Sequence, residues 1–180
     1  MPEFPSGRSP ASGLGHAVVV SCPADDLVSI ARTLESQPVA LLPVGGPGDL
    51  GRAAGVSALL LVEITEDGPR SAVTWRGTLA SSTPIRPDPG HLLPQAWVAR
   101  HPGAYEASRQ AGRVSPGAVT DDDWDHDETA LSQLYLPVST LERLPRERWL
   151  FSNELVPKQG RMGRTFAPPT PVVVALPPDD

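Results

Sequence analysis

The chain has 180 residues, of which 39% are hydrophobic and 20% charged, and its formal net charge is −6. This composition excludes a fully disordered chain, and the negative charge excludes binding to polyanions except through a local basic patch. One cysteine, Cys22, excludes an internal disulfide and a multi-thiolate zinc site within one chain. No apolar stretch reaches the roughly 20 residues of a membrane helix. We therefore expect a soluble, cytoplasmic protein with no membrane partner.

A chain of this length is most simply one domain around a single core. Residues 1–13 carry proline, serine and glycine without apolar periodicity, and residues 177–180 are Pro-Pro-Asp-Asp. Both segments predict tails. We expect one α+β domain over residues 14–176, rich in loops because the chain holds 22 prolines and 16 glycines.

The first part of the domain has a β-α-β pattern. Residues 16–21 are β-branched and apolar and predict a buried strand. Residues 24–36 predict an amphipathic helix with Pro23 at its first position, because apolar residues recur at helical spacing, at Leu27, Ile30, Ala31 and Leu34. Residues 39–44 predict a second strand, and Pro43 indicates an edge strand or the end of a strand.

A hairpin follows, with arms at residues 57–64 and 71–79 and a turn at 66–68. The second arm alternates between an apolar and a more polar set of side chains. We expect one face of this arm to contact water, the face that carries Ala72, Thr74, Arg76 and Thr78.

The second half is punctuated by proline. Within residues 84–117 only the short segment 104–110 looks helical. An acidic helix is predicted from Thr120 through Leu134 to Pro137, followed by one helical turn at 139–142, where Ser139 and Glu142 have the spacing of a capping box. The last predicted strands start at Trp149 and at Val172.

These elements predict an α+β fold. Its sheet is mostly antiparallel, with about five to six strands, because the connections around the hairpin are short. One main helix, 24–36, packs on the sheet, and the acidic helix is the second. A small barrel formed by curling the same sheet is the alternative.

Two patterns that suggest chemistry have simpler explanations. Gly46, Gly48 and Gly51 match the G-x-G-x-x-G spacing of dinucleotide sites, but too few residues follow for the required helix. We interpret them as a glycine-rich turn. Cys22 lies between a strand and a helix with no base nearby, which favours a buried core thiol.

The acidic run at residues 121–128 is a candidate metal site. On a helix, Asp123, His126 and Asp127 lie on one face at i, i+3 and i+4, which presents two carboxylates and an imidazole to a divalent cation. The alternative is an ordinary helix start, because Thr120 is a suitable N-cap and acidic side chains stabilise the first turn.

The basic segment 143–164 is a candidate anion site. It holds six basic residues against two glutamates, a local net charge of +4. We expect guanidinium and ammonium groups to bind phosphate there, from Arg146, Arg148, Lys158, Arg161 and Arg164. Trp149 and Phe166 would provide stacking faces for bases. Alternatively Trp149 belongs to the core, and the arginines pair with the acids of residues 121–128.

The favoured interpretation is a non-catalytic binding or accessory module without a cofactor, which holds nucleic acid or a nucleotide phosphate through residues 143–164. One alternative is a metal-dependent hydrolytic enzyme that uses the acidic cluster. Another is a protein-interaction subunit whose protein partner binds the proline-rich residues 84–117.

Overall fold

The structure is a computed structural model that describes residues 15–88, 93–110, 134–151, 154–157, 168 and 170–176. Its helices are α1 (Ala24–Ser36), α2 (Gln95–Arg100) and α3 (Pro102–Gln110), with short 3-10 helices η1 (Leu50–Arg52) and η4 (Arg146–Arg148). Its strands are β1 (His16–Pro23), β2 (Ala40–Val44), β3 (Ala58–Thr65), β4 (Gly68–Leu79), β5 (Leu134–Arg143), β6 (Leu150–Phe151), β7 (Val156–Pro157) and β8 (Val172–Ala175).

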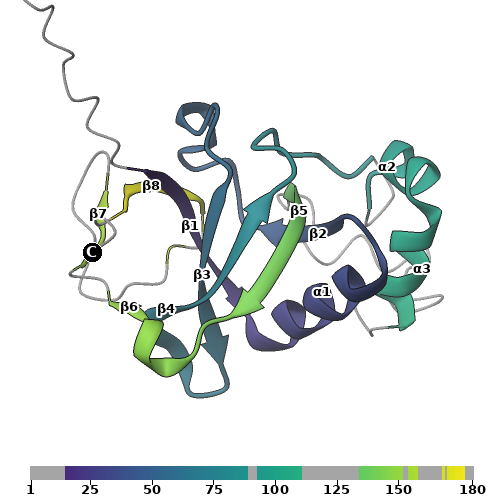
Figure 1. The fold of residues 1–180 in the computed structure, drawn as a ribbon. Coiled ribbons are helices and arrows are strands. Elements are labelled where there is room, and N and C mark those ends of the chain that lie inside the picture. Colours follow the sequence, from purple (N-terminus) through teal and green to yellow (C-terminus); the bar gives the residue numbers. More distant parts are fainter. Residues whose placement is uncertain are drawn as a thin grey trace, which may run out of the picture.

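The strands form one mixed sheet in the order β2-β5-β4-β3-β1-β8-β7, and β6 pairs with β4. The sheet curls into a half-barrel, with α1 below it and α2 and α3 at one end (Figure 1). The predicted α+β class is confirmed, and six of the described strands have four residues or more. The antiparallel prediction holds only in part, because β1 and β3 are parallel. The other strand pairings in the described part of the chain are antiparallel.

Helix α1 has the predicted bounds. Leu27 and Ile30 are fully buried and pack in the larger core cluster, together with side chains of β1, β3 and β5. Pro23 is the last residue of β1 and precedes the helix, one position before the predicted place. Asp25 and Asp26 lie in the first turn, where the helix dipole stabilises negative charge.

The hairpin is formed by β3 and β4, but β4 contains a bulge that changes which side chains face water. Leu61 pairs with Trp75 and Val62 with Val73, so Thr74 is an extra residue. Val73 and Trp75 therefore join core clusters on opposite faces of the sheet. The predicted wet face is right for Arg76, which is exposed, and wrong for Ala72 and Thr74, which are buried.

Strand β5 corrects the prediction for residues 134–143, which are extended and not helical. Leu134, Leu136 and Val138 alternate into the core, which is the period of a strand. Pro137, which has no N–H to donate, is tolerated because it precedes Val138, where the pairing of β5 with β4 begins. It lies opposite Leu41 of β2, and its carbonyl accepts the Ala80 N–H at 2.8 Å. The start of the predicted acidic helix lies outside the described residues.

Helix α2 is a second correction, because only residues 104–110 of this region were expected to be helical. Pro94 is its N-cap, and the Pro94 carbonyl accepts N–H bonds from Trp97 and Val98. Pro102 is the first residue of α3. Both prolines start helices, a position where the missing N–H costs nothing. No helix in the described part of the chain is long and apolar enough to cross a membrane.

Three further sequence predictions concern strand β2, the glycine-rich loop that follows it, and Cys22. Strand β2 lies at one edge of the sheet, which is one of the two positions that Pro43 indicated. The glycine-rich segment is a turn followed by η1, and at Gly48, where φ is +44°, a Cβ would overlap the Pro171 carbonyl oxygen. Cys22 is buried in the core.

Candidate functional site

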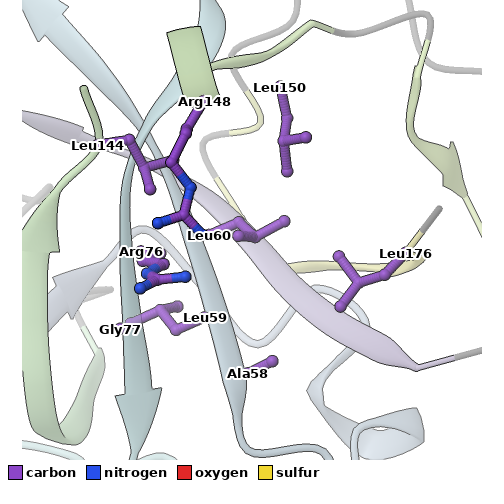
Figure 2. Close-up of a pocket in the computed structure, with 9 residues that line it drawn as sticks. All are labelled: Ala58, Leu59, Leu60, Arg76, Gly77, Leu144, Arg148, Leu150 and Leu176. Carbon is purple, nitrogen blue, oxygen red and sulfur yellow. The ribbon is translucent and has the colours of Figure 1, made fainter. Parts of the chain in front are cut away.

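A concavity of about 420 Å³ opens on the face of the sheet opposite α1. Figure 2 shows its lining, in which two arginines face a group of leucines. The lining residues come from β3, β4, η4, β6 and the turns after β5 and β8: Ala58, Leu59, Leu60, Arg76, Gly77, Leu144, Arg148, Leu150 and Leu176. The curl of the sheet brings these distant segments together.

The floor of the concavity is held by backbone hydrogen bonds. Leu60 lies in β3 opposite Arg76 of β4 and is almost fully buried. The Leu144 N–H donates to the carbonyl of the bulge residue Thr74 at 2.8 Å, and the Leu176 N–H donates to the Gly15 carbonyl at 2.8 Å. The apolar lining is therefore fixed by main-chain contacts to the sheet.

Gly77 lets β4 and β5 approach closely at one wall. A Cβ built on Gly77 would overlap the carbonyl oxygen of Thr140 in β5. Beside it lies a second concavity of about 490 Å³ that shares Arg76 and Gly77 and is lined further by Thr78, Thr140, Leu141 and Glu142. Arg76 thus stands between an apolar and a more polar hollow.

The two arginines differ in their partners. Arg76 pairs with Glu142 across the β4–β5 ladder, and its side chain is 46% exposed. Arg148 is exposed and forms no ion pair with another described residue. Figure 2 shows both guanidinium groups turned toward the same opening. Two cationic groups thus converge on one hollow, and among the residues that the structure describes one carboxylate, Glu142, pairs with them.

The position of Arg148 follows from the short helix η4. Pro145 is its N-cap, and its carbonyl accepts the Arg148 N–H at 2.9 Å. The indole N–H of Trp149 donates to the Leu144 carbonyl at 3.1 Å. The guanidinium carbons of Arg70 and Arg146 lie 5.9 and 6.0 Å from the centroid of the Trp149 ring. Trp149 is half-buried by these contacts and anchors the end of η4.

Of the residues predicted to bind an anion, the structure describes two. Arg148 lines the concavity, whereas Arg146, on the same short helix, contacts the Trp149 ring. The rest lie outside the described residues, namely Lys158, Arg161 and Arg164, together with Phe166. The predicted stacking role of Trp149 stays untested, although two guanidinium groups contact its ring.

Arg76 is a residue that the site predictions missed. Its alternation within the hairpin arm assigned it correctly to an exposed face, which was the available signal. Its proximity to the segment 143–164 depends on the pairing of β4 with β5, and residues 134–143 were expected to be helical. An error in one element therefore hid the convergence of Arg76 with Arg148.

The predicted metal site at Asp123, His126 and Asp127 lies outside the described residues. Within the part that is described, no three His, Cys, Asp or Glu side chains are arranged to hold a metal ion. Contacts between the acids of residues 121–128 and the basic segment also fall outside the described part. The metal-dependent enzyme and the protein-interaction role of residues 84–117 therefore stay predictions.

Comparison with known proteins adds no further evidence about the site. No protein-family model, curated protein or solved structure matches the chain.

Proposed function

We propose that this protein is a non-catalytic binding module that holds an anionic ligand between Arg76 and Arg148. The observation that carries the proposal is that both guanidinium groups line one apolar-walled opening. Among the described residues only Glu142 pairs with either of them. A bound anion would neutralise the remaining positive charge and accept hydrogen bonds from the planar guanidinium groups.

The proposed ligand is an anion, as the basic segment 143–164 predicted. Arg76 of β4 is added to the residues that would bind it. A nucleic-acid site would need open aromatic faces for the bases. The Trp149 ring is half-buried and contacts Arg70 and Arg146. The concavity therefore favours a small organic anion over a base stacked on Trp149.

Fluorescence titration with anilinonaphthalenesulfonate, a sulfonate on an apolar body, tests the proposal. We expect binding that weakens as salt is added, because ions screen exposed charges. The variant Arg148→Gln should raise the Kd by about 10- to 100-fold, since a hydrogen bond to a charged group contributes roughly 1.5–3 kcal/mol. Arg76→Gln should also raise the Kd, because it removes the second guanidinium group and leaves the Glu142 carboxylate without this partner.

Arg32→Gln is the matched control. Arg32 is exposed on α1, which packs on the other face of the sheet, and the substitution removes the same charge. Equal affinities of the wild type, Arg148→Gln and Arg32→Gln would refute the proposal. Fluorescence anisotropy with labelled oligo-dT at low salt provides a second arm. Salt-sensitive oligo-dT binding that anilinonaphthalenesulfonate does not compete with would place the anion site elsewhere.

A further inference from the structure

We infer that the ligand of this concavity is a small carboxylic acid with an apolar body, of the size of a medium-chain alkanoate. This inference rests on the proposed anion-binding function and adds the chemical class of the ligand. It depends on three features of the site: its net charge, the character of its walls and its volume.

The charge balance favours a monoanion. Arg76 and Arg148 contribute two positive charges to the opening, and Glu142, paired with Arg76, contributes one negative charge. One carboxylate would bring this group of charges to neutrality. A phosphate monoester, which is close to dianionic at neutral pH, would leave an excess negative charge beside Glu142.

The walls favour an apolar body. All the lining residues except Arg76, Gly77 and Arg148 are alanine or leucine. Leu60 and Leu144 form the floor and are only 6% and 7% exposed, so a ligand would bury little more of them. Leu150 and Leu176 are half-buried, and a ligand would cover their exposed apolar surface. In Figure 2, Leu150 and Leu176 lie across the opening from Arg76. An apolar body would therefore extend from the arginines toward these two leucines.

The volume indicates how large a ligand the hollow can hold. At about 30 Å³ for each water-sized group, a hollow of about 420 Å³ holds roughly a dozen non-hydrogen atoms. Octanoate is of this size, and its carboxylate would lie at Arg76, next to the hollow that contains Thr78 and Thr140. The polar end of the ligand would then face the more polar of the two hollows.

Calorimetric titration of the full-length protein with straight-chain alkanoates from butanoate to octanoate tests the inference. We expect the Kd to fall by about fourfold for each added methylene, because burying a methylene contributes about 0.8 kcal/mol. Octan-1-ol, which lacks the charge, and octyl phosphate, which carries a larger one, should both bind more weakly than octanoate. Leu176→Ser should weaken octanoate binding and leave butanoate binding nearly unchanged.

The outcomes separate the ligand class from the proposed function. If affinity depends on Arg148 but not on chain length, the ligand is an anion without an apolar body, and the inference is wrong while the proposed function stands. If octyl phosphate binds more tightly than octanoate, the carboxylate assignment is wrong. If neither the alkanoates nor anilinonaphthalenesulfonate respond to Arg148→Gln, both the inference and the proposed function are wrong.

Discussion

Glu63 is the only carboxylate among the described residues that is buried in the sheet, with 4% of its surface exposed. It accepts hydrogen bonds from Arg70 at 3.4 Å and Arg143 at 3.5 Å. These arginines in turn lie against aromatic rings, Arg70 against Trp149 and Arg143 against Trp75. The contacts of Glu63 thus connect β3 to β4 and β5, close to Trp149 at the end of η4. Two guanidinium groups compensate the buried carboxylate.

We expect Glu63→Gln to lower the free energy of unfolding by about 1–2 kcal/mol, because it removes charge-assisted hydrogen bonds whose arginine partners can still reach water. The control is Glu142→Gln, whose side chain is 57% exposed. An exposed ion pair contributes about 0–1 kcal/mol, so this variant should change stability less. Urea denaturation measures both. Equal effects of the two substitutions would mean that burial does not strengthen the Glu63 contacts.

At the scale of elements, the β4–β5 ladder decides whether the concavity forms. It aligns Arg76 with Glu142 and Gly77 with Leu141, and it ends near Arg143, one residue before Leu144 turns into the floor of the site. The bulge at Thr74 adds a second connection, because its carbonyl accepts the Leu144 N–H. Disturbing this ladder should therefore affect both the stability of the sheet and ligand binding.

We expect Gly77→Ala to lower the free energy of unfolding by about 1–3 kcal/mol, the usual cost of forcing extra atoms into a packed site. The added methyl would overlap the Thr140 carbonyl and push β5 away from β4. Gly51→Ala is the matched control, because nothing lies within 4 Å of its Cβ position. That variant should be neutral or stabilising by up to about 1 kcal/mol. Thermal unfolding of both variants measures the difference. If Gly77→Ala does not destabilise the protein, β4 and β5 can move apart to accommodate the methyl group without loss of stability.

The predictability of the elements depended on whether local sequence was enough to define them. Helix α1 and the β3–β4 hairpin were predicted closely, because apolar spacing and turn residues lie within each segment. Strand β5 was not, because the acidic residues at 121–128 are typical of a helix start and Pro137 is typical of a helix end. Its pairing with β2 and β4 depends on long-range contacts that a local pattern does not contain. Helix α2 was missed because proline favours both loops and helix starts.

The same reason limited prediction of the candidate site. The basic composition of residues 143–164 identified Arg148, whereas Arg76 belongs to a strand some 70 residues earlier. The leucines that line the concavity were recognisable only as apolar strand residues. They lie in β3, in β6 and after β5 and β8, and their position beside Arg76 depends on strand pairings and on the Thr74 bulge, which the alternation of side chains in β4 did not predict.

At the scale of the whole molecule, backbone amides in the middle of the sheet should be the most protected from hydrogen exchange. Strands β1 and β3 are hydrogen-bonded on both sides and have core clusters on both faces. We expect their amide protons to exchange most slowly, because their opening requires near-global unfolding. Those of the edge strand β2 should exchange faster. Hydrogen–deuterium exchange with mass spectrometry measures this order, and slower exchange in β2 than in β1 would contradict the arrangement of the sheet.

The wall that Leu176 contributes to the concavity has a consequence for how the protein is made. The opposite wall is already present in the β3–β4 hairpin, whose residues leave the ribosome about a hundred positions earlier. Because synthesis runs from the N-terminus, this wall of the hollow cannot form until Leu176 has emerged. A ligand that fills it would therefore bind only chains in which β8 has already joined the sheet, and its binding would report that step of folding.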